Sequence, residues 1–213
     1  MTISGDVTNK STKTPRQTVP ENAPKPFSFS STLTLVRAQP TIYEMITIRK
    51  LISADYDDFY SMRLKMLESS ATNYTAGLSD WKNASKEQII SYLQEGETGS
   101  DNFVLGAFDV GLIGMAGFRR ETREAVRHKG STWGLFEAVN VEHLNVEESL
   151  LKKVIEIVRT YSDFEYIRTV QNAENLKKLD LFLKVGFKQY GLEERSMRVG
   201  DKYFNQVYLK FDL

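Results

Sequence analysis

From Met45 to Leu213, helix-type and strand-type hydrophobic patterns follow one another in an order that few folds accommodate. Alternating apolar residues over 46–51 predict a first strand, and apolar residues at helical spacing over 146–161 predict an amphipathic helix. The whole succession is β-α-α-β-β-β-α-β-α-β-β. We therefore expect an α/β domain whose mixed, mostly antiparallel central sheet has about seven strands, with helices on both faces.

Short local signals mark where some of these elements begin and end. Ser85 and Gln88 have the spacing of a capping box at the start of the second helix. Gly186 follows the last helix, predicted over 173–185, and is a usual helix stop. The segment 69–84, between the first two helices, predicts a loop.

The first 44 residues differ in composition from the rest of the chain. All five prolines lie within the first 40 residues, and the remainder of that stretch is mostly Ser, Thr, Asn, Gln and Lys. Such a segment buries too little apolar surface to offset the entropy of ordering it, so we predict a disordered arm over 1–44 and a folded domain over 45–213. Within the arm, Phe27–Val36 alternates well enough to add to a sheet edge, and an organelle transit peptide is an alternative for the whole arm.

The composition argues against several classes of function. Lys plus Arg and Asp plus Glu both number 28, so the formal net charge is zero and no nucleic-acid or anionic-membrane partner is expected. The chain has no cysteine, which rules out a disulfide framework, a thiolate metal site and a cysteine nucleophile. No apolar run reaches the roughly 18 residues of a membrane helix. We predict a cytoplasmic protein that does not enter the membrane.

Three stretches of sequence carry a family resemblance. They are HKGSTWGLFEAV at 128–139, NAENLKKLDLFLKVGFKQYG at 172–191 and LEERSMRVGDKYFNQVYLKF at 192–211. They resemble, in order, the fourth strand, the N-x-x-A-x-x-x-Y-x-x-x-G-F segment and the closing hairpin of the GNAT family of N-acetyltransferases. The resemblance spans about 46–213. It implies acetyl-CoA as co-substrate and a small-molecule or protein amine as acceptor.

The phosphate-binding loop of that family has no counterpart here. In the family, the fourth strand runs into a loop of the form R/Q-x-x-G-x-G/A, whose backbone N–H groups hold the cofactor pyrophosphate at a helix N-terminus. The basic position falls on Glu142, and the two glycine positions fall on Asn145 and Glu147. Asn145 and Glu148 instead have the spacing of a capping box, which would satisfy the same amides. We therefore predict a helix that caps itself and a degenerate cofactor loop.

The resemblance also assigns residues around the reacting thioester. The general-acid tyrosine position falls on Phe182, which has no proton to donate. Phe136, Glu137 and Ala138 correspond to the fourth-strand backbone that holds the pantetheine arm, and Asn175 to an asparagine on the same side. The alternative for Asn175 is that it only lies near the start of a helix. Glu137 is the candidate general base, with a partly exposed strand-end carboxylate as the alternative.

Other polar and aromatic residues have simpler interpretations. His143 lies among glutamates, but a solvated charged loop is commoner than a metal site, so we predict no metal. His128 lies in a charged loop and is expected to be exposed, and the basic residues over 119–129 form a candidate surface for an acidic partner. We expect Tyr74, Trp81 and Tyr92 to pack over the sheet rather than stack on a ligand.

These residues leave two main hypotheses. The favoured one is a GNAT-like protein with impaired or absent acetyl transfer and a binding or regulatory role, through a protein partner or a homodimer. The alternative is an active N-acetyltransferase that binds acetyl-CoA through a non-standard loop. A third, weaker idea is a cleft that takes an acyl donor lacking the nucleotide of CoA.

Overall fold

The structure is a computed structural model that describes residues 46–69, 72–74 and 77–213. The predictions for the arm 1–44, including Phe27–Val36, lie outside these residues. The strands are β1 (Thr47–Lys50), β2 (Asn102–Phe108), β3 (Leu112–Arg120), β4 (Lys129–Glu137), β5 (Tyr166–Asn172), β6 (Lys188–Val199) and β7 (Lys202–Asp212). The helices are α1 (Tyr56–Ser69), α2 (Leu78–Lys82), α3 (Lys86–Thr98), α4 (Val146–Arg159) and α5 (Leu176–Val185).

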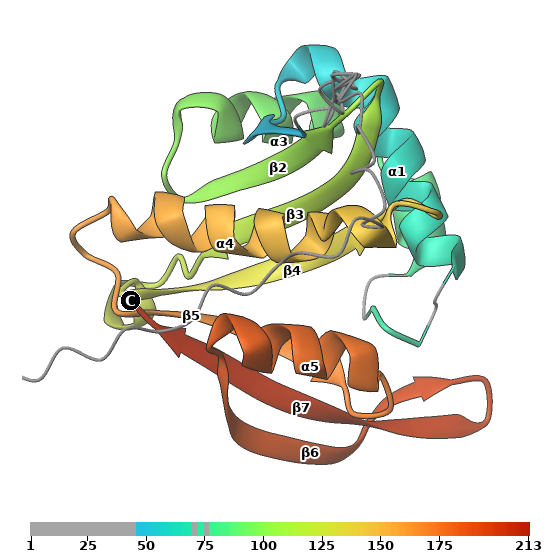
Figure 1. Cartoon of the computed structure of the whole chain (residues 1–213), viewed down its shortest axis with the longest axis vertical. Helices are drawn as coiled ribbons and strands as arrows, with labels where there is room; N and C mark the ends of the chain where they lie inside the picture. Colours follow the sequence, from blue (N-terminus) through green and yellow to red (C-terminus); the bar gives the residue numbers. More distant parts are fainter. Residues whose placement is uncertain (1–45, 70–71, 75–76) are drawn as a thin grey trace, which may run out of the picture. The chain divides into compact units, whose positions relative to one another are not determined.

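The strands form one sheet in the order β1-β2-β3-β4-β5-β7-β6 (Figure 1). Every neighbouring pair is antiparallel except β4 and β5, which run parallel. The predicted fold class, a seven-stranded and mostly antiparallel sheet in an α/β domain, is confirmed.

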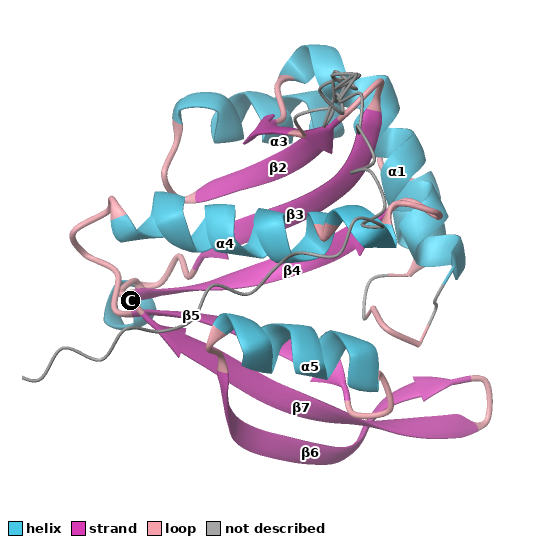
Figure 2. Cartoon of the chain, in the orientation of Figure 1, coloured by secondary structure: helices cyan, strands magenta, loops and turns pink. Residues whose placement is uncertain are grey.

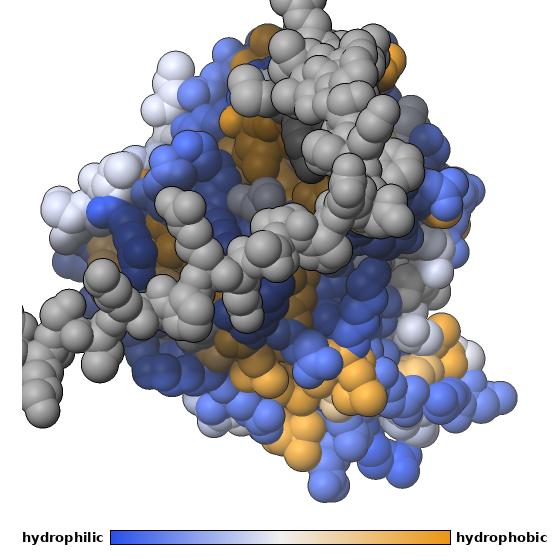
Figure 3. All heavy atoms as spheres, viewed as in Figure 1, coloured by the Kyte–Doolittle hydropathy of each residue, from blue (hydrophilic) through white to orange (hydrophobic). Residues whose placement is uncertain are grey.

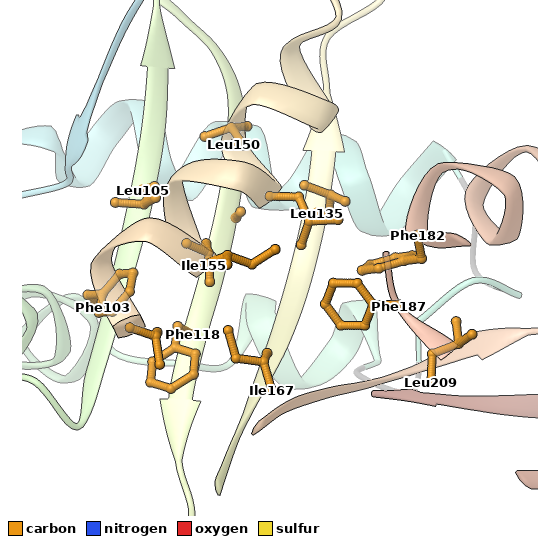
Figure 4. Packing of buried hydrophobic residues seen from close by; sticks show 14 of the residues in the cluster. Phe103, Leu105, Phe118, Leu135, Leu150, Ile155, Ile167, Phe182, Phe187 and Leu209 are labelled. Carbon is orange, nitrogen blue, oxygen red and sulfur yellow. The ribbon is translucent and has the colours of Figure 1, made fainter. Parts of the chain in front are cut away.

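Helices cover both faces of the sheet, α4 and α5 one face and α1 and α3 the other (Figure 2). Each face has its own hydrophobic core. The core beneath α4 and α5 holds residues such as Leu105, Phe118, Leu150 and Phe182 (Figure 4), and the core beneath α1 and α3 holds residues such as Phe59 and Met115. The alternation of apolar side chains along β2 and β3 supplies both cores, because successive strand residues point to opposite faces.

Most of the local predictions are confirmed, with one correction. Ser85 Oγ accepts from Gln88 N at 3.2 Å, which closes the predicted capping box of α3, and α5 ends at Gly186, whose φ is 111°. The segment 69–84, predicted as a loop, contains the five-residue helix α2. A helix of little more than one turn is too short to show a hydrophobic period.

Strands β4 and β5 separate after a short parallel contact. Their pairing covers only Lys129–Ser131 against Tyr166–Arg168, beyond which β5 pairs with β7 alone. On its other side β4 carries a bulge, since Met115 and Gly117 of β3 face Phe136 and Trp133. The result is a splay between two central strands, next to a locally twisted β4.

Gly134 forms the bulge and has a φ of 62°, in the left-handed region that favours glycine. The bulge changes the alternation of side chains. Trp133 packs in the α1 and α3 core, whereas Leu135, two residues later, lies in the α4 and α5 core. The splay is therefore bordered by the aromatic Trp133 on one face of the sheet and by the aliphatic Leu135 on the other.

Candidate cofactor and ligand site

The chain enters α4 through a left-handed residue rather than a capping box. Asn145 has φ 52° and ψ 40°, and its side chain makes no hydrogen bond to the helix, so the predicted Asn145–Glu148 box is wrong. An N-cap side chain reaches the first amides from extended backbone, which Asn145 does not adopt. The Glu147 amide instead donates to the carboxylate of Glu137, at 3.4 Å. A carboxylate from the end of β4 therefore occupies the anion position of this helix start.

Lys178 of α5 closes the space between α5, α4 and β4. Its ammonium group forms an ion pair with Glu147 and donates to the carbonyl oxygen of Leu135 at 3.1 Å. The Lys178 and Glu147 side chains are only 11% and 12% exposed. Tyr74 Oη also donates to this carbonyl, at 3.3 Å, so both of its lone pairs are engaged. The Leu135 carbonyl of β4 is therefore already hydrogen-bonded within the protein.

Sequence reasoning missed both Lys178 and the Leu135 carbonyl. One signal was present, because Lys178 lies three residues after Asn175 and so belongs to the first turn of α5. Asn175 itself is the N-cap of α5, and its Oδ1 accepts from Lys178 N at 3.1 Å. The helix-start interpretation of Asn175 therefore describes what its side chain does.

Glu148 also has lysine partners. Its carboxylate contacts Lys152 at 2.8 Å and Lys184 at 2.5 Å. Hydrogen bonds from these two ammonium groups lower the pKa of Glu148. Glu148 is thus held by α4 and α5 side chains, not by the amide of Asn145.

The other residues predicted to line the cleft make contacts within the fold. Phe182 is fully buried and meets Phe187 edge-to-face, with ring centroids 5.0 Å apart (Figure 4). Ala138 N donates to Ile113 O at 2.8 Å, and Phe136 faces Met115 in the β3–β4 register. None of these groups presents a hydrogen to an incoming thioester.

Glu137 lies in a poorly solvated position beside α4. Its side chain is 11% exposed, its carboxylate lies 3.8 Å from Lys177 Nζ, and the charge of Lys178 also acts on it. Burial, and then the neighbouring Glu147 charge, raise the pKa of Glu137. A raised carboxyl pKa suits a general base, yet the side chain points to the helix start and does not line the cavity described next.

A cavity of about 330 Å³ lies in the splay between β4 and β5. Of the residues singled out from the sequence, Tyr74 and Phe182 line it, whereas Glu137, Asn175 and the acidic loop do not. Its lining contains three arginines and, among the described residues, no carboxylate. The arginines are Arg63, Arg119 and Arg168. The splay therefore holds a cavity lined by arginines, next to the ion pair of Lys178 and Glu147.

The predicted exposure of His128 is wrong, and the candidate basic surface over 119–129 loses Arg120. His128 is half-buried and packs edge-on against Tyr166, with centroids 5.9 Å apart. Arg120 is 6% exposed and pairs with Asp101 and Asp163, so it is not available to an acidic partner. A buried arginine needs its own carboxylates, and these come from loops distant in sequence.

The aromatic residues pack within the protein, as predicted. Trp81 stacks on Tyr60 with centroids 5.8 Å apart, and Tyr92 lies 6.2 Å from Trp133. Among the described residues, no cluster of three or more His, Cys, Asp or Glu side chains could hold a metal ion. The same part of the chain has no helix that is both long and apolar enough to span a membrane.

The fold matches solved acetyltransferase structures. The acetyltransferase of the GNAT family from Streptococcus pneumoniae superposes with a TM-score of 0.71 at 17% identity, covering 79% of this chain and 99% of that one. A putative acetyltransferase from Salmonella typhimurium with its cofactor acetyl-CoA gives 0.67 at 13%, covering 79% and 94%. A GNAT superfamily phosphinothricin acetyltransferase from Sinorhizobium meliloti in complex with acetyl-CoA gives 0.66 at 17%, covering 79% and 88%.

Comparisons at the level of sequence find nothing similar. No family model matches the chain, and no curated protein sequence does. The chain therefore has the fold of the GNAT acetyltransferases, with a sequence that has diverged widely from the solved examples.

Proposed function

We propose that this chain is a GNAT-fold protein in which transfer of acetyl from acetyl-CoA is impaired or absent, and which acts by binding a ligand or partner. The bridge from Lys178 to Glu147 and to the Leu135 carbonyl carries the proposal. By the family resemblance, this carbonyl belongs to the strand that holds the pantetheine arm, and Glu147 replaces a glycine of the phosphate loop. The Lys178 side chain thus bonds to the carbonyl and the loop residue at which the cofactor would otherwise bind.

The charges around the start of α4 do not fit a pyrophosphate. Four glutamates lie in or near the first turn of α4: Glu137, Glu142, Glu147 and Glu148. The carboxylate of Glu137 already accepts a hydrogen bond from the backbone amide of Glu147. Two like charges about 4 Å apart repel by on the order of 4 kcal/mol near a protein surface, before salt screening. Lysines already pair with three of these charges, Lys178 with Glu147, Lys152 and Lys184 with Glu148, and Lys177 with Glu137. A phosphate would have to compete with these carboxylates for the lysines and with Glu137 for the Glu147 amide. The residues present therefore do not form a site for the CoA phosphates, and no catalytic step is assigned through CoA.

The general-acid position supports the same proposal. A departing thiolate needs a proton, and the ring of Phe182, although it lines the cavity, has none to donate. A separate change at this position and in the phosphate loop is simpler to understand if acetyl transfer is no longer the function.

The alternative is an active N-acetyltransferase that takes acetyl-CoA through a non-standard loop and acetylates a small-molecule or protein amine. Its support is the raised pKa of Glu137, which suits a base, and the acetyl-CoA named with two of the solved structures of this fold. It requires Lys178 to leave Glu147 and turn to a phosphate.

The partner in a binding role has a candidate surface on α5. Leu176 and Leu183 are 67% and 50% exposed, and Figure 3 shows hydrophobic side chains gathered over this part of the molecule. A patch of this kind suits a protein partner or a second copy of the chain. Sedimentation of the full chain, beside Leu176→Lys and Leu183→Lys variants, separates a monomer from a homodimer formed through this patch.

Release of free CoA thiol tests acetyl transfer directly. Because the chain has no cysteine, a thiol reagent has no protein background. Full-length protein, acetyl-CoA and a panel of amines and amine-bearing peptides should give no thiol above the rate without protein. Steady release that depends on both protein and amine would establish the alternative. A Lys178→Ala, Tyr74→Phe double variant, which removes both side-chain donors to the Leu135 carbonyl, distinguishes a merely blocked enzyme from one that has lost the chemistry.

A further inference from the structure

Arg63 is a half-buried arginine whose guanidinium pairs with no carboxylate of the described residues. It lies on α1 and lines the cavity in the β4–β5 splay. Its Nε has no hydrogen-bond partner among the described residues and no solvent contact. Within the described part of the chain, its side-chain hydrogen bond runs from Nη1 to the thioether sulfur of Met66, at 3.7 Å, and a thioether is a weak acceptor.

Two indole rings surround the guanidinium instead of carboxylates. Arg63 Cζ lies 4.7 Å from the centre of the Trp133 ring and 5.6 Å from that of Trp81. Burial lowers the pKa of Arg63 to about 10. The rings hold the cation by cation–π contacts, but they leave its N–H groups without acceptors. A planar fork of donors in a poorly solvated place is a site prepared for a carboxylate.

The bulge of β4 keeps this space open. A Cβ placed on Gly134 would lie 2.8 Å from Arg63 Nη1, so a larger residue would require the guanidinium to move. The positive φ of the same residue turns Trp133 toward the cation. The backbone of β4 and the side chain of Arg63 thus form one local arrangement.

The remainder of the cavity lining is consistent with an acid that has an apolar body. Arg119 adds an exposed positive charge, and Arg168 is paired with Glu121. Apolar lining comes from Trp133, Leu135, Val170 and Phe182. A volume of about 330 Å³ lies at the small end of ligand pockets, which span about 300–1,000 Å³. This volume suits a ligand the size of an amino acid or a short arylalkanoic acid.

We propose that the splay cavity binds a small carboxylic acid with an apolar body, whose carboxylate pairs with the Arg63 guanidinium. The proposal deepens the binding role above by naming the class of ligand. The proposal does not depend on whether acetyl-CoA can bind at the start of α4. Arg63 lies on α1, whereas Lys178 and Glu147 lie on α5 and α4.

The test compares acids with their uncharged amides on the full-length chain, without acetyl-CoA. The probes are benzoate, phenylacetate, 3-phenylpropionate and hexanoate, each beside its amide, titrated by calorimetry. In parallel, the Arg63 Nε–H signal is followed by NMR and is assigned from its absence in Arg63→Met. At least one acid should bind about ten-fold more tightly than its amide or better, since a bond to a charged donor is worth this much. That acid should also shift the Arg63 signal.

Variants separate the charge from the shape of the cavity. Arg63→Met should weaken the acid about ten-fold or more and leave the amide unchanged. Arg63→Lys keeps the charge but loses the planar pair of donors, so it should also lower the affinity for the acid. This variant replaces Arg63→Met in the test if the methionine variant does not fold. Arg198→Met, at an exposed arginine of β6 that pairs with Asp201, is the control and should change nothing.

Three results would overturn the proposal: no acid binds better than its amide, an acid binds without moving the Arg63 signal, or Arg63→Met retains the preference for the acid. Since acetyl-CoA is absent from every sample, none of these results depends on the outcome of the thiol-release assay.

Discussion

Two arginines that pack inside this domain, the half-buried Arg63 and the buried Arg120, should respond in opposite ways to the same substitution. Arg63 has no carboxylate partner among the described residues, whereas Arg120 pairs with Asp101 and Asp163 and also donates to the Arg127 carbonyl at 2.7 Å. Each has an aromatic ring over its guanidinium, Trp133 at 4.7 Å and Phe164 at 4.2 Å. Methionine replaces either side chain by an apolar one of similar length. The comparison therefore isolates the effect of carboxylate pairing.

The expected changes follow from the surroundings of each charge. A fully buried unpaired ion costs several kcal/mol, the half-buried Arg63 bears part of that cost, and its cation–π contacts return about 0.5–2 kcal/mol each. Arg63→Met should thus stabilise the fold by about 1 kcal/mol, or raise Tm by about 2–4 °C for a domain of this size. Breaking a buried pair costs about 3–5 kcal/mol. Because Asp101 and Asp163 are 52% and 61% exposed, Arg120→Met should lose about 3 kcal/mol, at the low end of that range.

Urea unfolding of the full chain at pH 7, followed by circular dichroism, measures both changes. The slope of free energy against urea should stay the same, so that the midpoints report stability alone. If Arg63→Met lost as much stability as Arg120→Met, Arg63 would have a structural role, and the argument that its charge awaits a ligand would fail.

Three further substitutions test other parts of the structure. Gly134→Ala places a side chain at φ 62° and against Arg63, so it should cost about 1–2 kcal/mol in urea unfolding; no loss would show that the bulge can relax. Asn175→Ala removes the N-cap of α5 and should cost about 1 kcal/mol, whereas Asn175→Asp should retain most of it. The pKa of Glu137 is raised, so its ionisation destabilises the fold as pH rises through that pKa. Glu137→Gln should therefore raise Tm at pH 7 and have no effect on Tm below the ordinary glutamate pKa of about 4.3; an equal effect at both pH values would contradict the assigned cause.

The sequence predicts the elements of this fold well, because hydrophobic period and local caps depend on neighbouring residues. Helix α4 shows this best, with an apolar stripe that is fully buried from Leu150 to Val158. The box at Ser85 and the stop at Gly186 are equally local. Whether φ of a residue is positive cannot be predicted from its neighbours in the same way. Asn145 has the residue type and spacing of an N-cap, and only the structure reveals its left-handed conformation.

The contacts that define the site could not be predicted in the same way. Lys178 meets Glu147 only because α5 packs beside α4, and no periodicity reports that distance. Arg63 gave a weaker signal: it lies four residues after Phe59 and beside Met62, on the buried side of α1, where a charged residue is unusual. The roles of Glu137 and the acidic loop, the order of the arm 1–44 and the cytoplasmic location remain predictions.

The central claim is that acetyl-CoA has no site beside α4. Calorimetric titration of acetyl-CoA into the full-length chain at low salt tests it, beside the triple variant Glu142→Arg, Asn145→Gly, Glu147→Gly. The variant restores the basic and glycine positions and frees Lys178 from its ion pair. The account predicts no heat of binding for the native chain at micromolar concentrations and a measurable affinity for the variant. Micromolar binding by the native chain would contradict it.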